Sequence, residues 1–203
     1  MFIIGYFLED IAQERFMIAL VERIIKEERF HDSVCHDVRN ASGGRGGVLK
    51  ELKKYFQNVK KLTGSASSCD LVIVAIDGNC GTYSKMQQNI MKRKDVIKYQ
   101  GEVICAVPDP HIERWYLIDG HALRIVIGAS DFAICPSYKC EKDRYKNAII
   151  DYLSRNDIKP IFGGAEYGED IIKIVDLEKL QREDGGFNSF INDLRGFLRR
   201  HQC

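Results

Sequence analysis

Residues 69–79, CDLVIVAIDGN, constrain the fold more than any other stretch of this chain. Apolar and mostly β-branched side chains fill the run from Leu71 to Ile76 without alternating with polar ones. A strand of this composition is buried on both faces, as are the central strands of a parallel sheet that carries helices on each side. The run therefore predicts an α/β fold.

The neighbouring sequence supplies the other elements of such a sheet. Strand patterns and amphipathic helix patterns alternate in this order: 2–8, 11–28, 29–39, 48–62, 69–79, 82–99 and 101–107. This alternation predicts parallel strands joined by right-handed helical crossovers, in a Rossmann-type arrangement. Beyond about residue 130 helical patterns predominate, including a basic one at 135–156. With 203 residues, we expect a core over 1–130 and a mainly helical extension over 131–203, packed on the same domain.

Composition argues against several classes of protein. The net charge of the chain is only +1, whereas many nucleic-acid-binding proteins are strongly basic. No apolar run reaches the roughly 18 residues that a membrane span needs, and residues 1–10 lack the features of a signal peptide. The seven cysteines show no paired metal-ligand spacing, and Cys80 and Cys105 are expected to act as small hydrophobic residues at strands. These features predict a cytoplasmic protein that does not enter membranes.

Acidic residues stand where three predicted strands end. Glu9 and Asp10 follow the first strand, Asp77 follows the third, and Asp109 and Glu113 follow the fourth. Ligands of open α/β sheets bind outside the carboxyl ends of the strands. These carboxylates are therefore expected to converge if the strands are neighbours. Converging carboxylates repel one another, and a hard cation such as Mg²⁺ or Mn²⁺ relieves the repulsion.

Each of these acids also has a purely structural interpretation. Glu9 and Asp10 would cap the first helix, and Asp77 would belong to an Asp-Gly-Asn turn. Asp109 and Glu113 would simply stand at the start of a helix.

The order of these residues resembles the Toprim superfamily, which includes topoisomerases, DnaG-type primases and the overcoming-lysogenization-defect nucleases. Three segments are similar to a group of small, stand-alone Toprim-like proteins often found with an ATPase partner: FLEDIAQERFMIALVERI, VIVAIDGNC and VPDPHIERWYLID. Glu9 matches the Toprim glutamate and Asp77 the first acid of the Asp-x-Asp motif, while Asn79 replaces the second acid. Glu113 matches the glutamate of a Pro-x-x-Ile-Glu-x-Trp-like segment. The resemblance spans roughly residues 1–120 and implies a Toprim-like core.

The resemblance implies phosphoryl-transfer chemistry on nucleic acid with Mg²⁺ or Mn²⁺. The metal ligands implied by the comparison and by the strand ends are Glu9, Asp77, Asn79, Asp109 and Glu113. Because the amide of Asn79 is neutral, either Asp109 or Glu113 is expected to supply the missing charge, or one metal binds instead of two. Such a metal would polarise the phosphate and lower the pKa of a bound water. Hydrolysis with water as the nucleophile is therefore expected.

Two residues of the 107–119 segment are further catalytic candidates. His111, like Glu9, is a candidate base, or else hydrogen-bonds a carboxylate ligand. Arg114 is a candidate for stabilising phosphate charge. The alternatives are a surface histidine and an ion pair between Arg114 and a nearby acid. Two aromatic residues that follow are expected in the core: Trp115 and Tyr116.

Phosphate-binding candidates lie in two other segments. The GGRGG sequence at 43–47 precedes a predicted helix, where backbone N–H groups and the helix dipole favour anions. Its candidate residues are Gly43, Gly44, Arg45 and Gly46. Lys142 and Lys146 of a basic segment are candidates for contacts with a nucleic-acid backbone. A flexible turn and a solvated helix face are the plain alternatives.

The acidic strand ends and the resemblance together predict a metal-dependent nuclease acting on DNA or RNA. The resemblance further implies that it is the effector of an ATPase-associated defence system, and oligomerisation is an open possibility. Two other functions remain open. One is a non-catalytic regulatory or nucleotide-sensing partner subunit, which Asn79 favours and the presence of Glu9, Asp77 and Glu113 opposes. The other is a small-molecule phosphohydrolase using the same metal site.

Overall fold

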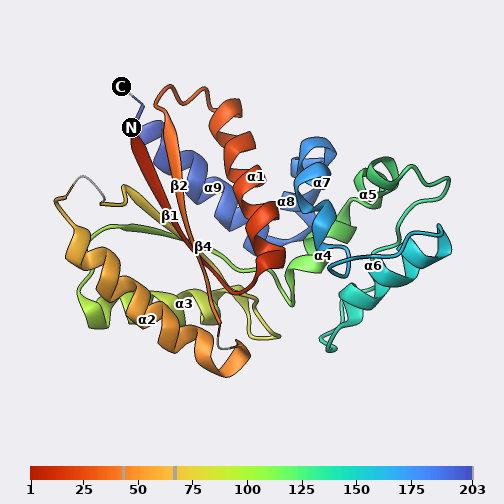
Figure 1. Cartoon of the computed structure of the whole chain (residues 1–203), viewed down its shortest axis with the longest axis horizontal. Coiled ribbons are helices and arrows are strands. Elements are labelled where there is room, and N and C mark those ends of the chain that lie inside the picture. Colours follow the sequence, from red (N-terminus) through yellow and green to blue (C-terminus); the bar gives the residue numbers. More distant parts are fainter. Residues whose placement is uncertain (43, 66–67, 203) are drawn as a thin grey trace.

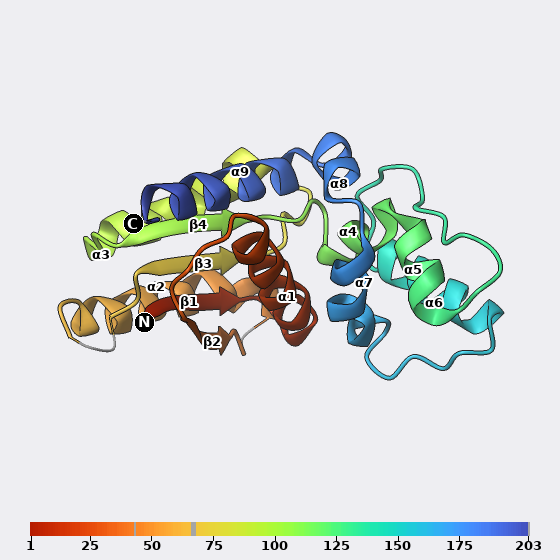
Figure 2. The same cartoon turned by 90° about the horizontal axis from the view of Figure 1, so that it is seen from above.

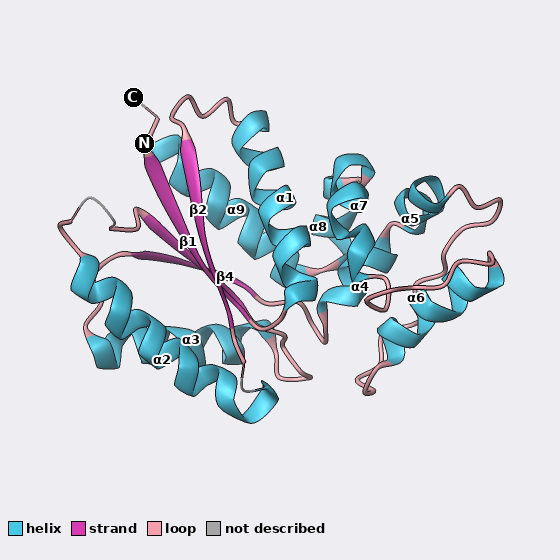
Figure 3. Ribbon diagram, in the orientation of Figure 1, coloured by secondary structure: helices cyan, strands magenta, loops and turns pink. Residues whose placement is uncertain are grey.

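The computed structural model describes residues 1–42, 44–65 and 68–202 and is built on a four-stranded parallel sheet (Figures 1 and 3). In spatial order the strands are β2 (Val34–Asn40), β1 (Phe2–Leu8), β3 (Leu71–Ala75) and β4 (Glu102–Ala106). All residues of β3 are buried, which confirms the interpretation of the apolar run as a central strand. The chain thus has the α/β, Rossmann-type architecture that its sequence predicts.

Helices cover both faces of the sheet (Figure 2). One face carries α1 (Ile11–Glu27) and α9 (Gly185–Arg200), and the other carries α2 (Gly44–Leu62) and α3 (Tyr83–Ile97). Side chains of β1, β3 and β4 alternate between the two hydrophobic cores: Tyr6 and Ile73 pack with α1 and α9, whereas Phe7 and Val72 pack with α2 and α3. Both faces of the central strands are therefore buried.

A group of short helices extends the molecule beyond one end of the sheet (Figure 1). It comprises α4 (Ile112–Ile118), α5 (Gly120–Ile127), α6 (Arg144–Arg155), the 3₁₀ turn η1 (Ala165–Tyr167), α7 (Gly168–Ile174) and α8 (Leu177–Glu183). Within the described ranges, no helix is both long and apolar enough to cross a bilayer.

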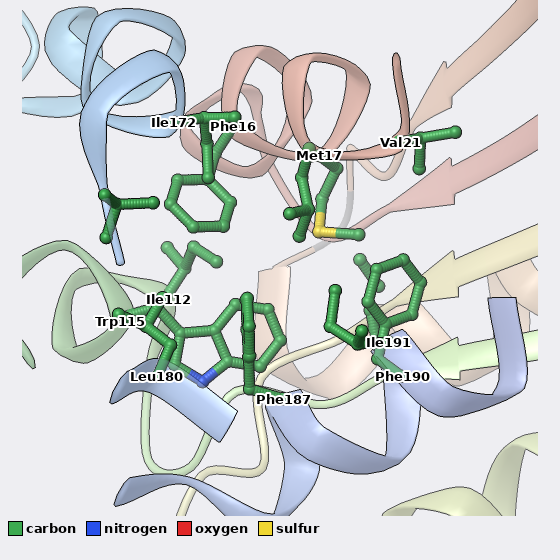
Figure 4. Close-up of a cluster of buried hydrophobic side chains, with 14 of the residues drawn as sticks. Phe16, Met17, Val21, Ile112, Trp115, Ile172, Leu180, Phe187, Phe190 and Ile191 are labelled. Atoms are coloured by element: carbon green, nitrogen blue, oxygen red, sulfur yellow. The ribbon is translucent and has the colours of Figure 1, made fainter. Parts of the chain in front are cut away.

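A continuous core joins these helices to the sheet (Figure 4). Trp115 of α4 is fully buried, and its ring meets that of Phe187 of α9 edge-to-face at 5.0 Å between centroids. Phe16 of α1 stacks on Tyr116 at 4.9 Å. The prediction that Trp115 and Tyr116 belong to the core is confirmed.

Three local predictions are wrong. The basic helix expected at 135–156 begins only at Arg144, and residues 132–141 have no regular secondary structure. Pro136 lies in that stretch and lacks the N–H group that a helix interior requires. The loop expected at 43–47 is largely helical, since α2 begins at Gly44, while Gly43 lies outside the described residues. Cys80 is not a small buried hydrophobe but an exposed residue in a disulfide.

Candidate active site at the carboxyl edge of the sheet

The sheet topology singles out the carboxyl ends of β1 and β3. The chain leaves β1 for β2 on one side and then crosses back to β3 on the other, so the strand order reverses between β1 and β3. A crevice at such a reversal is the usual ligand site of an open α/β sheet. Glu9 comes directly after β1, and Asp77 lies two residues beyond β3. The two strands are neighbours, which was the condition for their acids to meet.

Glu9 and Asp77 are connected by hydrogen bonds. Glu9 Oε2 accepts a 2.8 Å hydrogen bond from the backbone N–H of Asp77. Asp77 Oδ1 accepts from the backbone N–H of Ile112 at 3.2 Å, which links the end of β3 to the start of α4. Asp10 caps α1 by accepting from the N–H of Gln13 at 3.1 Å. The capping alternative therefore holds for Asp10, whereas Glu9 faces the strand ends.

Gln13 belongs to this site and was missed by the sequence analysis. Its side chain is fully buried; its Oε1 accepts from the backbone N–H of Glu9 at 3.0 Å and its Nε2 donates to Asp77 Oδ1 at 2.9 Å. One amide thus bonds both the carboxyl of Asp77 and the backbone of Glu9. A signal was present in the sequence, because Gln13 is one helical turn before Phe16 and Met17 and occupies an apolar-face position of the helix with a polar side chain.

Asp77 lies in an environment that opposes its ionisation. Only 8% of the residue is exposed, and burial is the main cause that raises the pKa of its carboxyl well above the usual value. The negative charges of Glu9, Glu113 and Asp10 raise this pKa further, and the hydrogen bond from Gln13 lowers it. Acids from two distant segments, Glu9–Asp10 and Glu113, therefore act on Asp77.

Glu113 lies in the first turn of α4, and its carboxyl also has a raised pKa. Burial is the main cause; Asp10 and Asp143 raise the pKa further, while Lys146 lowers it. Glu113, Lys146 and His111 line a cavity of about 20 Å³, which suits a single water molecule. Lys146 therefore lies at the acidic edge as a counter-charge. His111 stands at the N-cap of α4, where its side chain forms no capping hydrogen bond.

The turn after β3 is packed closely against the segment that follows β4. The backbone N–H of Gly78 donates to Pro108 O at 2.7 Å, and that of Asn79 donates to Pro110 O at 3.0 Å. A Cβ on Gly78 would lie 3.1 Å from Pro108 O, so this close approach favours glycine. Asn79 has a left-handed backbone (φ 47°), and its side-chain amide donates to Asp77 O at 3.1 Å. Asn79 thus has a structural role in the turn.

Asp109 lies beside this turn. Its Oδ2 accepts a 3.0 Å hydrogen bond from the hydroxyl of Tyr138, while its Oδ1 is buried without a hydrogen-bond partner among the described residues. An unpartnered buried carboxylate oxygen is costly. Asp109 is therefore a residue for which an additional ligand, such as a cation, would be favourable.

Arg114 forms the ion pair that was its alternative interpretation. Its guanidinium contacts the carboxylate of Asp184, which is 4% exposed and caps α9 by accepting from Phe187 N at 2.8 Å. It also donates to Glu183 O at 3.0 Å. Arg114 therefore fixes the start of α9 against α4. The sequence analysis did not find Asp184.

A disulfide between Cys80 and Cys140 joins the β3 turn to the irregular stretch before α6, with 5.6 Å between the Cα atoms. Tyr138 of that stretch donates a hydrogen bond to Asp109. The charge of Asp143, at its end, raises the pKa of Glu113. The disulfide therefore fixes the stretch before α6 next to the turn after β3, beside the acidic site.

The remaining phosphate-binding candidates have different surroundings. Gly44, Arg45 and Gly46 form the first turn of α2, which follows β2 and so starts at the carboxyl edge of the sheet. Gly43 lies outside the described residues. Lys142 is exposed, with 4.0 Å between its Nζ and Asp143 Oδ2.

The acids of this site are of the chemical type that binds a divalent cation, but they are not arranged around a common point. Glu9, Asp77, Glu113 and Asp109 offer the oxygen ligands that Mg²⁺ and Mn²⁺ prefer. Across residues 1–42, 44–65 and 68–202, however, no three or more His, Cys, Asp or Glu side chains are placed to hold one ion together. Cation binding by this set would require side chains to rotate.

Comparison with protein-family models, with curated proteins and with solved structures found no match.

Proposed function

We propose that this chain is a metal-dependent nuclease that hydrolyses phosphodiester bonds of DNA or RNA at the acidic edge of the sheet. The observation that carries the proposal is the burial of Asp77 beside Glu9, whose Oε2 accepts a 2.8 Å hydrogen bond from the Asp77 backbone N–H. This burial and the charges of Glu9 and Glu113 raise the pKa of the Asp77 carboxyl. Strongly perturbed acids that cluster at a ligand-binding edge are typical of functional sites. The resemblance of the three segments to Toprim-like proteins supports the same chemistry and an ATPase partner in a defence system.

Glu9, Asp77 and Glu113 would hold the Mg²⁺ or Mn²⁺ ion, with Asp109 as a further oxygen ligand. When bound, the ion would polarise the phosphate and activate a water molecule. Gln13 orients the carboxyl of Asp77 through its 2.9 Å hydrogen bond. Lys146, at the same small cavity as Glu113, would attract the phosphate group.

A non-catalytic, nucleotide-sensing partner subunit is the second candidate function. Two observations favour it. The position of the second Toprim acid is occupied by Asn79, whose side chain hydrogen-bonds within the turn, and the described acids do not surround a common point.

Cleavage assays with matched variants distinguish these functions. The purified chain would be incubated with supercoiled plasmid, single-stranded DNA and structured RNA, in Mg²⁺, Mn²⁺ or a chelator. The wild type and Asp77→Asn would be compared with Asp32→Asn, which alters an exposed acid in the loop before β2. We expect metal-dependent cleavage by the wild type and Asp32→Asn, and a loss of at least about a hundredfold in Asp77→Asn.

The alternatives predict other outcomes. Binding of nucleotide or nucleic acid without cleavage by the wild type would favour the partner subunit. Cleavage of a small phosphodiester such as bis-p-nitrophenyl phosphate, but of no nucleic acid, would favour a small-molecule phosphohydrolase. Equal cleavage by the wild type and Asp77→Asn would refute the proposed site.

A further inference from the structure

The outer edge of β2 offers a row of backbone groups for pairing. β2 is the first strand in the sheet order, and β1 is its only strand neighbour in the described parts of the chain. At the opposite border of the sheet, α9 lies against β4, whereas Figure 2 shows β2 along a border with no helix beyond it. An open edge of this length is a template for another strand.

The hydrogen bonds to β1 show which residues of β2 face outward. Ser33 O accepts from Phe2 N at 2.8 Å, and Ala41 N donates to Leu8 O at 2.8 Å. Because the bonding direction alternates along a strand, the odd-numbered residues from 33 to 41 bond to β1. The N–H and C=O groups of four residues therefore point away from the sheet: Val34, His36, Val38 and Asn40.

The side chains of β2 fix its two faces. His36 is held beneath α1 by a 2.8 Å hydrogen bond to the Tyr6 hydroxyl and lies 3.6 Å from the carboxylate of Glu22. Val34 and Val38 pack against the same core. A slip of β2 by one residue along β1 would turn these side chains away from the core, so the register of β2 is fixed.

The opposite face of β2 carries an acid and a base side by side. Asp37 and Arg39 are both exposed, and neither takes part in an ion pair within the described residues. They line a hollow of about 540 Å³ with Lys54 and Tyr55 of α2, so a long side chain from a second strand has space there.

We propose that two copies of this chain pair antiparallel through β2, about a two-fold axis perpendicular to the sheet at Val38. Because Val38 has outward-facing backbone groups, it would meet Val38 of the second copy as a hydrogen-bonded pair. Asp37 would then lie opposite Arg39 of the second copy in a non-hydrogen-bonded pair. The two-fold axis makes two such pairs, one on each side of Val38. In such pairs the Cα atoms are only about 4.5 Å apart and the side chains are closest.

The charges select this register among its neighbours. An axis at residue 37 would oppose Asp37 with Asp37, and an axis at residue 39 would oppose Arg39 with Arg39. Like charges directly opposite each other destabilise strand pairing, whereas opposite charges stabilise it. The contact is self-complementary, as a two-fold dimer requires. It does not depend on the proposed nuclease activity.

Charge exchange across β2 tests this dimer by sedimentation equilibrium, with circular dichroism to verify the fold. We expect the wild type to be dimeric and both Asp37→Arg and Arg39→Asp to weaken the dimer at least about tenfold, because each places like charges opposite one another twice. The double variant Asp37→Arg/Arg39→Asp should restore it, since the exchanged charges remain complementary. Lys53→Glu, an exposed charge reversal on α2, should leave it unchanged.

Val38→Pro provides a second test. Proline is tolerated on an edge strand but removes the central donor of the interface, so the dimer should be lost in a folded chain. A monomeric wild type at concentrations of about 0.1 mM, where interfaces of ordinary affinity are saturated, would overturn the proposal. A dimer that is insensitive to both single reversals would also overturn it, as would a folded double variant that stays monomeric.

Discussion

Replacing Asp77 by asparagine is expected to stabilise the protein while removing its function. Asparagine keeps the shape of the side chain and an oxygen that can accept from Gln13 Nε2 and Ile112 N, as Asp77 Oδ1 does. It removes the ionisable group that is buried near Glu9 and Glu113. The variant therefore loses the cost of ionising Asp77 in the folded state.

The magnitude follows from linkage. The folded pKa of Asp77 is raised, so the wild type loses stability as the pH rises from the ordinary aspartate value through the folded value. Each unit by which the pKa of Asp77 is higher in the folded than in the unfolded chain corresponds to about 1.4 kcal/mol of unfolding free energy. We expect Asp77→Asn to be more stable than the wild type at pH 7, and each kcal/mol gained would raise the Tm by roughly 2–4 °C for a chain of this size. The gain should shrink as the pH falls through the ordinary aspartate pKa of about 3.9, because unfolded Asp77 then becomes neutral as well.

Urea unfolding of the wild type and Asp77→Asn between pH 3.5 and 8 measures this difference directly, with Asp32→Asn as the control. A loss of stability in Asp77→Asn at pH 7 would refute the reasoning. It would mean that the carboxylate is a stabilising structural group. A gain that is independent of pH would contradict the electrostatic cause.

Three further predictions concern groups around the site. Gln13→Leu removes the buried donor to Asp77 and should lower the unfolding free energy by about 1–3 kcal/mol in urea titrations, whereas a change below about 0.5 kcal/mol would show that the amide has no such role. The Cys80–Cys140 disulfide closes a loop over a sequence separation of 60, so Cys80→Ala/Cys140→Ala should lose about 4 kcal/mol relative to the oxidised wild type, and equal stabilities would show that the disulfide does not constrain the chain. Trp115→Ala should cost about 3–5 kcal/mol by calorimetry, because the ring is fully buried against Phe187, and a cost below about 1 kcal/mol would contradict its place in the core.

Local sequence patterns predicted the sheet and the strand ends well. β3 is readable because an unbroken β-branched run suits a strand buried on both faces, and the acids after β1 and β3 follow from where those strands stop. The start of α2 was harder to predict from the sequence, since glycine disfavours helix by about 1 kcal/mol per residue. Packing of Val48 and Leu52 against the sheet outweighs that preference.

Pairs distant in sequence were not predictable from local patterns. Arg114 and Asp184 are 70 residues apart, and the cysteines of the disulfide are 60 apart. Their contacts arise only when α9 docks on the sheet and when the stretch before α6 folds over the β3 turn. Gln13 lies between these cases, because its helical position was readable but its partner Asp77 is 64 residues away.

Cation binding by the acidic edge is the central claim, and calorimetric titration with Mn²⁺ tests it most directly. The folded wild type should bind Mn²⁺, and Glu9→Gln, Asp77→Asn and Glu113→Gln should each abolish binding, while Asp32→Asn binds like the wild type. Binding that survives all three substitutions would place the ion elsewhere. Failure of the wild type to bind Mn²⁺, both alone and with single-stranded DNA or RNA present, would contradict the proposed metal-dependent chemistry.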